Sequence, residues 1–330
     1  MILVLLSGCT DKTSITPAFY VWKSKLSAKD ADTSYLNSLQ AEKLYLRMFD
    51  VDDKGNGAVP MAEYSPDTVH IPGTIVPVIF ITNRTFLKCA PGEVGALAEK
   101  CIKKIDEMYM LHFNKLPQEY QFDCDWTEKS RETYFKFLES VSKLKPEAVT
   151  SCTIRLHQIK YKSRTGVPPV DKGVLMYYAS SEPTDFDSPN TILDNQKASL
   201  YIDHIGSYPL HLDIALPLYS WGIVRNTFAK IKLINGVCEA DISLHPEYYE
   251  KKQNGVYEIL RSHYLRGMWI NKGYMLKIEE VSPEALQEAA GTLQKKLKAE
   301  DREIIFYHLD KDILERYSTE DLQNIIKALS

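Results

Sequence analysis

Apolar residues recur along the chain in two patterns, as short runs typical of buried strands and as longer stretches with helical spacing. The strand-like runs cover residues 18–24, 43–50, 76–83, 120–126, 152–159, 173–179, 210–218 and 303–310. The helical stretches cover residues 30–42, 92–112, 128–144, 190–206, 283–299 and 312–329. Strands that alternate with helices indicate a parallel sheet. Eight such strands in a chain of this length predict an α/β fold, the (β/α)8 TIM-type barrel.

The same pattern predicts that the barrel is somewhat irregular. No clear helix follows the second or the fifth strand, where the sequence is loop-like. Roughly 85 residues separate the seventh strand from the eighth, far more than a usual connection, and they contain two hairpin-like stretches. We therefore expect an insertion at residues 222–281 within a barrel that spans residues 18–330. Asp312 is the expected N-cap of the last helix.

The first residues form an apolar run that ends in Leu6, Ser7, Gly8 and Cys9. This run resembles the end of a bacterial lipoprotein signal, in which small residues allow cleavage before a cysteine that then carries lipid. The resemblance implies a signal and tether at residues 1–17, with Cys9 as the lipidated residue. It also implies a protein of the bacterial cell envelope, anchored to a membrane on its extracytoplasmic side. The run is short and lacks a basic segment before it, so a plain hydrophobic terminus is the alternative.

Composition excludes some classes of function. The chain has 330 residues, 44% of them hydrophobic and 25% charged, which is ordinary for a globular protein. A net charge of −4 gives no electrostatic basis for binding nucleic acid. The five other cysteines show no metal-ligand spacing and are expected to be free thiols. Residues 52–63 partly fit a calcium loop, but Lys54 occupies a ligand position and a strand precedes the segment. We expect no metal and no cofactor.

Polar and aromatic residues gather toward the carboxyl ends of the predicted strands, where ligands bind in such barrels. They are Asp50, Asp52, Asn83, Asp123, Asp125, Arg155, His157, Tyr178, Asp213, Tyr219, Trp221, His308 and Asp310. Side chains alternate along a strand, so Asp123 and Asp125 share the face that points into the barrel mouth. Two carboxylates so close repel each other, and at least one pKa is expected to rise, as in groups that supply acids and bases. The alternative is a structural ion network in which Arg155 or Arg47 neutralises Asp123.

The segment FDCDWT, residues 122–127, is similar to the fourth-strand signature D-G-x-D-x-D-x-E of chitinase-like glycosidases. Asp123 and Asp125 match its second and third aspartates, and Trp126 matches its common aromatic residue. The leading Asp-Gly is absent, and Thr127 stands where the family has its acid/base glutamate. In that family the glutamate protonates the leaving oxygen. A threonine does not supply that proton.

Most of residues 18–310 also resembles a group of uncharacterised, barrel-shaped bacterial lipoproteins, through stretches such as LYLRMFDVD and DIALPLYSWG. Together the resemblances imply a glycoside-hydrolase-like barrel that acts on or binds polysaccharide. The alternative is a non-catalytic envelope lipoprotein that binds a glycan or a protein. Thr127 favours the alternative, whereas the many ionisable strand ends favour an enzyme.

Each candidate residue has an expected role under the first interpretation. The catalytic candidates are Asp123, Asp125, Asp213 and His157. The ligand-binding candidates are Asp50, Asp52, Asn83, Trp126, Arg155, Tyr178, Tyr219, Trp221, His308 and Asp310.

Overall fold

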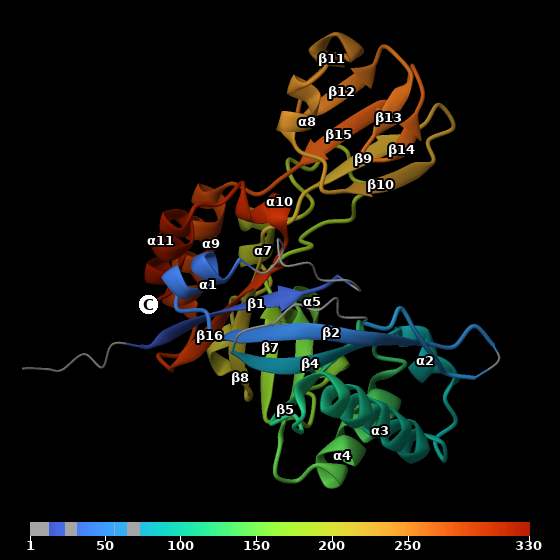
Figure 1. Ribbon diagram of the computed structural model, residues 1–330, viewed down its shortest axis with the longest axis vertical. Helices are drawn as coiled ribbons and strands as arrows, with labels where there is room; N and C mark the ends of the chain where they lie inside the picture. Colours follow the sequence, from blue (N-terminus) through green and yellow to red (C-terminus); the bar gives the residue numbers. More distant parts are fainter. Residues whose placement is uncertain (1–12, 24–31, 56, 65–72) are drawn as a thin grey trace, which may run out of the picture.

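The computed structural model describes residues 13–23, 32–55, 57–64 and 73–330. The expected lipidation site, Cys9, lies outside these residues. The described chain forms a closed barrel of parallel strands (Figure 1). Its strands are β1 (Ile15–Val21), β2 (Lys43–Asp52), β4 (Thr74–Ile81), β5 (Glu119–Asp123), β6 (Val149–Arg155), β7 (Lys172–Met176), β8 (His211–Pro217) and β16 (Arg302–Tyr307). Strand β1 closes the barrel because it pairs with both β2 and β16. The predicted fold class is confirmed, and each predicted strand overlaps one strand of the barrel.

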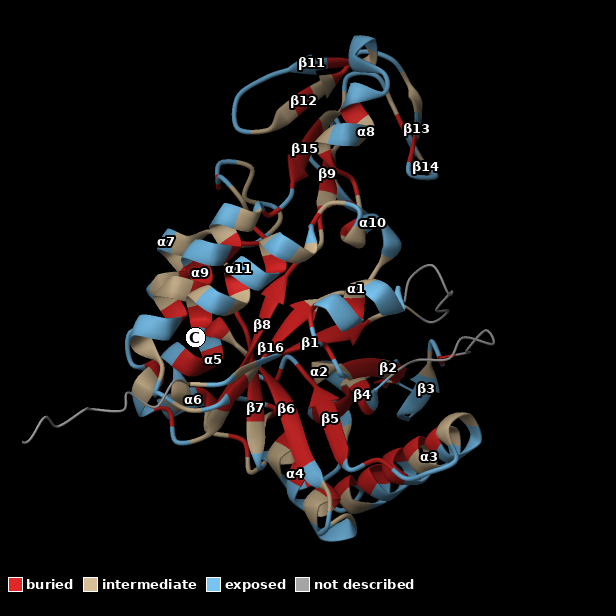
Figure 2. Cartoon of the chain, turned by 60° about the vertical axis from the view of Figure 1, so that its left-hand side comes forward, coloured by how far each residue is buried: buried red, intermediate tan, exposed pale blue. Residues whose placement is uncertain are grey.

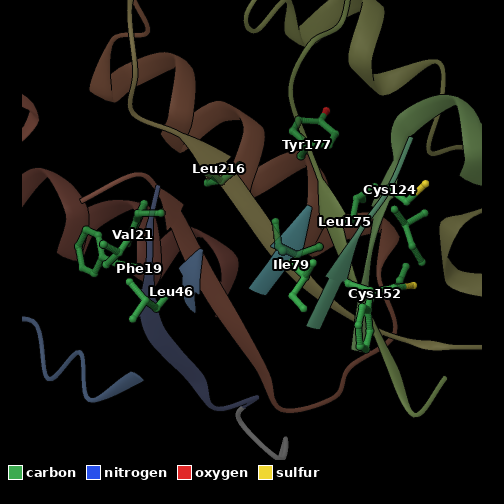
Figure 3. Close-up of a cluster of buried hydrophobic side chains, with 14 of the residues drawn as sticks. Phe19, Val21, Leu46, Ile79, Cys124, Cys152, Leu175, Tyr177 and Leu216 are labelled. Carbon is green, nitrogen blue, oxygen red and sulfur yellow. The ribbon is translucent and has the colours of Figure 1, made fainter. Parts of the chain in front are cut away.

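The outward side chains of the strands form the main apolar core against the surrounding helices. Figure 3 shows members of this layer from six strands, among them Phe19, Leu46, Ile79, Cys152, Leu175 and Leu216. Each is fully buried, and burial of one such apolar side chain stabilises the fold by roughly 1.5–3 kcal/mol. The five cysteines within the described residues are free thiols, as expected.

Helices cover the outside of the barrel, with their exposed faces outward and the buried strands within (Figure 2). They are α1 (Thr33–Ser38), α2 (Asn83–Lys88), α3 (Val94–Phe113), α4 (Arg131–Leu144), α5 (Leu156–Lys160), α6 (Lys162–Thr165), α7 (Asn195–Ser199), α9 (Pro283–Lys296), α10 (Lys311–Leu314) and α11 (Thr319–Leu329). Among the described residues, none of these helices combines the length and the apolar character needed to cross a membrane.

Two predicted helices differ from the structure. The stretch 190–206 forms only α7 and the 3-10 turn η1 (Ile205–Ser207), because the Asn190 side chain accepts hydrogen bonds from the backbone of Ile192 and Leu193 and holds a turn there. The last stretch is split into α10 and α11. Asp310 caps the first and Ser318 caps the second, so the expectation that Asp312 is the N-cap is wrong.

The barrel is irregular at the places that the sequence predicted, after β2, after β6 and between β8 and β16. After β2 comes the short strand β3 (Val59–Met61), which pairs antiparallel with β2. After β6 come only the short helices α5 and α6. An insertion separates β8 from β16, as predicted.

The insertion is built on an antiparallel sheet with its own apolar core. The strand order is β10 (Ile231–Asn235), β9 (Trp221–Arg225), β15 (Met275–Glu279), β12 (Val256–Ile259) and β11 (Tyr249–Lys251). The remaining elements are α8 (Glu239–Ser243), η2 (Pro246–Tyr248) and the hairpin of β13 (His263–Leu265) and β14 (Met268–Ile270). Figure 1 shows this sheet beyond α10, outside the barrel.

A buried ion pair fixes the insertion to the barrel. Lys277 on β15 is fully buried, and its Nζ lies 2.8 Å from the Glu279 carboxylate. The same ammonium donates to the carbonyl of Ser188, which belongs to the connection between β7 and α7. The Glu279 carboxylate also accepts a hydrogen bond from Thr191 in that connection.

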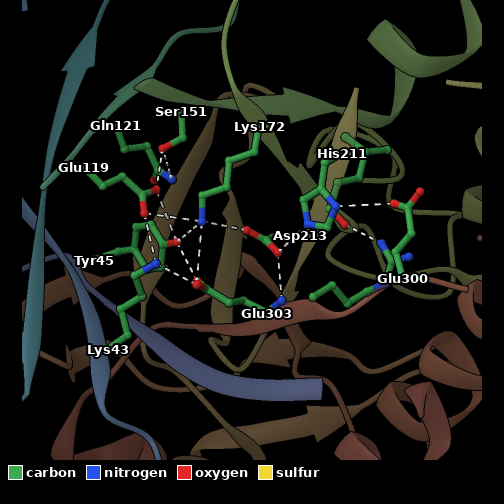
Figure 4. Close-up of polar contacts among 12 residues, drawn as sticks. Lys43, Tyr45, Glu119, Gln121, Ser151, Lys172, His211, Asp213, Glu300 and Glu303 are labelled. Atoms are coloured by element: carbon green, nitrogen blue, oxygen red, sulfur yellow. Dashed lines mark hydrogen bonds and ion pairs between the residues drawn. The ribbon is translucent and has the colours of Figure 1, made fainter. Parts of the chain in front are cut away.

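A charged layer fills the barrel at the amino ends of the strands (Figure 4). Lys172 Nζ lies 2.9 Å from Asp213 and 3.3 Å from Glu119, and Lys43 Nζ lies 2.6 Å from Glu303. Burial raises the pKa of Asp213, but a hydrogen bond from His211 and the charge of Lys172 outweigh that effect and lower the pKa to about 2. The sequence pattern assigned Asp213 to the mouth of the barrel. That placement is wrong, because Asp213 stands near the start of β8.

Candidate ligand-binding site

A pocket of about 730 Å³ opens at the carboxyl ends of the barrel strands, where the fold class predicts ligand binding. Its volume lies within the range of small-molecule sites. All eight barrel strands contribute residues at or just beyond their ends, and others come from the insertion and from the chain after β16. The predicted site residues that line it are Asp50, Asp123, Asp125, Arg155, Tyr178, Tyr219, Trp221, His308 and Asp310.

Arg155, at the end of β6, binds both aspartates of the chitinase-like segment. Asp123 is 3% exposed, and its Oδ1 lies 3.3 Å from Arg155 Nη2 and accepts a 2.5 Å hydrogen bond from Thr153. The Asp125 side chain is 54% exposed and bonds to Arg155 Nε. Asp123 is therefore the deeper member of the pair and Asp125 the shallower one. Burial raises the pKa of Asp123, and the Arg155 charge opposes that rise.

The other carboxylates of the pocket are also held by cations. Asp50 forms an ion pair with Arg47, so Arg47 does not neutralise Asp123. Lys23 lies 2.6 Å from Asp310. Asp312 is bound by Arg266, which comes from the turn between β13 and β14 of the insertion. Each carboxylate that lines the pocket in the described chain thus has a positively charged partner.

Aromatic rings form one wall of the pocket. Tyr178 stacks on Tyr307 with 5.7 Å between ring centroids, and Trp22 lies 5.5 Å from Tyr307. Tyr219 lies 5.3 Å from Trp221. The Trp221 indole N–H donates to Glu279 at 2.8 Å, so the insertion fixes the orientation of this ring. The rings are held by one another and by hydrogen bonds, and they present a rigid, largely apolar surface with polar edges.

Two other predicted site residues lie behind the barrel wall. Trp126 is fully buried, and its indole N–H donates to the Thr165 carbonyl at 2.9 Å. It packs on Tyr134 of α4, so it cannot stack on a ligand in the pocket. Asn83 begins α2, where its side chain accepts a hydrogen bond from Ser130.

Asp52 and His157 also lie outside the pocket lining. Asp52 is bound by Arg84 and by Thr82, and these hydrogen bonds lower its pKa to about 2. His157 lies on α5, because β6 ends at Arg155 and a hydrogen bond from the Arg155 N–H to Gln158 Oε1 begins the helix at that point. The prediction that His157 lies near the end of a barrel strand is therefore wrong.

Thr127, which stands where the chitinase-like signature has its acid/base glutamate, does not line the pocket. Thr127 is exposed, and its N–H donates to Ser130 Oγ at 2.9 Å at the start of α4. The next residue, Glu128, is exposed and pairs with Arg164 at 2.9 Å. Of the described residues that line the pocket, none is a glutamate.

Several residues that line the pocket were not predicted from the sequence. Trp22 and Tyr307 stand at the ends of β1 and β16, and the rule that singled out Tyr178 would have found them. Arg266 and Arg316 carry no such signal, because only the folded insertion and the chain after α10 bring them to the pocket.

Comparison with known proteins identifies the fold. No family model matches the chain, and no curated protein matches it in sequence. The spore cortex-lytic enzyme SleL of Bacillus cereus is similar in structure over 97% of this chain and 75% of its own, with a TM-score of 0.57 and 14% identity. A chitinase of Chromobacterium violaceum covers 96% of this chain and 98% of its own, with a TM-score of 0.54 and 8% identity. A class V chitinase of Nicotiana tobaccum covers 96% and 99%, with a TM-score of 0.51 and 9% identity. The chain therefore shares the TIM-type barrel of glycoside-hydrolase-like proteins.

Proposed function

We propose that this protein binds oligosaccharide segments of a polysaccharide in the pocket at its barrel mouth. The observation that carries the proposal is the wall of mutually packed rings around Tyr307, which faces a set of hydrogen-bonding groups fixed in ion pairs. Sugar rings offer an apolar face to an aromatic side chain and hydroxyl groups to carboxylates and guanidinium groups. The pocket combines both kinds of contact within a volume suited to a few sugar units.

The comparisons support a carbohydrate ligand. A structure of a variant of the tobacco class V chitinase holds NAG4, and that enzyme shares this fold over 96% of the chain. Because the identity is only 9%, the support concerns the class of ligand and not its composition.

Binding without hydrolysis fits the pocket best. General acid catalysis of glycoside cleavage needs a protonated carboxyl within reach of the glycosidic oxygen. Thr127 and Glu128 lie outside the pocket, and the exposed carboxylate of Asp125 is paired with Arg155. Hydrolysis remains the second candidate because burial raises the pKa of Asp123, which favours its protonated form.

We propose further that Cys9 carries a lipid and that the barrel acts outside the cytoplasm of a bacterial cell, anchored to a membrane. The support is the Leu-Ser-Gly-Cys segment alone. Replacement of Cys9 by serine should abolish labelling by radioactive palmitate, whereas replacement of Cys89 should leave the labelling unchanged. Equal labelling of the Cys9 variant and the wild type would refute the anchor.

The binding proposal is tested with purified protein and an array of neutral and acidic oligosaccharides, followed by calorimetry on those that bind. Asp125→Ala and Trp221→Ala should each weaken binding at least tenfold. Glu128→Ala and Trp269→Ala are the matched controls, since both side chains are exposed and lie outside the pocket lining. Both controls should bind like the wild type. Absence of binding to every oligosaccharide would refute the proposal.

Hydrolysis is tested in the same samples by chromatography of the bound oligosaccharides after long incubation. Intact oligosaccharides support a binding protein. Cleavage that is lost in Asp123→Asn would establish the second candidate instead.

A further inference from the structure

One cation of the pocket differs from the others. Arg316 follows α10 and lines the pocket, but it forms no ion pair with any carboxylate of the described chain. Its Nη2 donates to the Leu218 carbonyl at 3.0 Å, and its guanidinium lies 5.8 Å from the Tyr317 ring. A guanidinium has five N–H donors. Most of those donors are therefore available to a ligand.

Two uncharged polar groups on the same side of the pocket also lack partners. Ser220 is 1% exposed and lines the pocket, yet its Oγ has no hydrogen-bond partner among the described residues. The same is true of His308 Nδ1, which is buried and belongs to another residue of the lining. Buried polar groups normally have partners, so two unpartnered groups at one pocket wall point to a ligand that supplies the missing bonds.

Two hydrogen bonds to backbone carbonyls bring these groups together. The carbonyl that Arg316 binds belongs to Leu218, two residues before Ser220. The Leu218 N–H donates to the Tyr307 carbonyl at 2.6 Å, immediately before His308. Ser220, His308 and Arg316 therefore form one cluster at the ends of β8 and β16, which we call the β8–β16 cluster.

We propose that the β8–β16 cluster binds the carboxylate of an acidic sugar unit, and this inference rests on the proposed oligosaccharide binding. A guanidinium fits a carboxylate with two parallel hydrogen bonds, a geometry that also fixes the orientation of the sugar. The hydroxyl of Ser220 and the imidazole of His308 are suited to bind the carboxylate or the adjacent ring oxygen. The chemical class of the ligand is a glycan that carries carboxylates, whether on uronic acid units or on a lactyl ether.

The charges of the pocket favour a ligand group with a single negative charge over a dianion. Lys23, Arg47 and Arg266 each have a carboxylate partner in the pocket, and Arg155 has two. Arg316 is the remaining cation of the described lining, so this wall offers a single positive charge. One carboxylate neutralises that charge, and a dianion would leave a negative charge beside Asp310 and Asp312.

The test uses oligosaccharides in matched pairs, each with its carboxylates intact or reduced to alcohols. The probes are hexasaccharides of hyaluronan, polygalacturonate and alginate and glycan strands of peptidoglycan with free lactyl groups, together with neutral chitin hexasaccharide. We expect the wild type to bind at least one carboxylated probe about tenfold more tightly than its reduced form, as a charge-assisted bidentate contact implies.

Variants locate the contact. Arg316→Gln should remove the preference for the carboxylated probe over its reduced form. Arg316→Lys keeps the positive charge but not the planar pair of N–H donors, so it should retain part of the preference. Ser220→Ala should weaken binding of the carboxylated probe. Arg164→Gln is the control, because Arg164 is exposed and lies outside the pocket lining. Melting curves establish that each variant is folded.

The outcomes separate this inference from the proposed function. Equal binding of carboxylated and reduced probes would overturn the inference while oligosaccharide binding stands. A preference that persists in folded Arg316→Gln would also overturn it. Binding of no probe by the wild type would overturn both proposals.

Discussion

The shared ion pairs of Arg155 lead to a prediction about stability. Methionine in place of Arg155 preserves the unbranched aliphatic part of the side chain but removes the cation that Asp123 and Asp125 share. The two aspartates should respond differently. Asp125 is largely exposed, so water replaces the lost contact at a cost of about 0.2–1 kcal/mol. Asp123 is 3% exposed and keeps, among the described residues, only the Thr153 hydroxyl as a donor of a hydrogen bond.

The loss of stability has an upper bound that depends on pH. Removal of one partner of a buried ion pair costs about 3–5 kcal/mol when the other charge stays buried. Asp123 can avoid that cost by protonation. For a carboxyl with an ordinary pKa near 3.9, protonation costs about 4 kcal/mol at pH 7 and about 1.5 kcal/mol at pH 5. We therefore expect Arg155→Met to lower the free energy of unfolding by about 3–4 kcal/mol at pH 7 and by about half as much at pH 5.

The sign of this pH dependence follows from linkage. Without Arg155 the pKa of Asp123 in the folded protein rises further above its unfolded value, so the folded variant binds more protons than the unfolded chain. Its stability relative to the wild type therefore increases as the pH falls from 7 toward that raised pKa.

Urea denaturation followed by tryptophan fluorescence at pH 7 and pH 5 measures both quantities. The double variant Asp123→Asn/Arg155→Met should recover most of the loss, because the buried group is then neutral. Arg164→Met is the control, since its pair with Glu128 is exposed on both sides and should contribute less than about 1 kcal/mol. A loss below about 1 kcal/mol at pH 7, or an equal loss at both pH values, would refute the argument.

Two further predictions concern the insertion and the charged layer. Glu279→Gln should lower the free energy of unfolding by about 3–5 kcal/mol, because Lys277 is fully buried and loses its counter-charge. In the double variant Lys277→Met/Glu279→Gln, urea denaturation should show that most of this stability is recovered, because no buried charge is left without a partner. His211 lies 3.3 Å from both Asp213 and Glu300, and the hydrogen bond with Asp213 raises its pKa. The contribution of the protonated His211 to the free energy of unfolding is fully present below its unfolded pKa, which is near 6.5. It is lost as the pH rises through the raised pKa of the folded protein. The wild type should therefore exceed His211→Asn in stability at pH 5.5 but not at pH 9, and a constant difference would contradict the assignment.

The strands of the barrel could be predicted from the sequence because they are continuous apolar runs buried on both faces. The strand limits could not be predicted with the same accuracy. Residues 152–159 read as a single strand, yet a side-chain contact between Gln158 and the Arg155 backbone converts the last four residues into a helix. That local hydrogen bond decided the position of His157.

The candidate site was predictable where it depends on strand ends alone. Asp123, Asp125 and Arg155 follow from position and alternation along neighbouring strands. Asp213 was misplaced because alternation gives the face of a strand but not the depth within the barrel. Arg316 was missed because its place depends on how the chain packs after β16. Contacts that join segments far apart in the sequence leave no local pattern.

The arrangement around Arg155 answers why the chain keeps two aspartates so close together. One guanidinium has five N–H donors, so it can bind Asp123 with Nη2 and Asp125 with Nε. The deeper carboxylate fixes the guanidinium from below, and the shallower one remains half in solvent. The two aspartates match a chitinase-like signature in sequence, but Thr127 stands where that signature has its proton donor. Asp123 is turned toward Arg155 and Thr153 and is only 3% exposed. The pair therefore holds the Arg155 guanidinium in a fixed position at the pocket, as the proposed oligosaccharide binding requires.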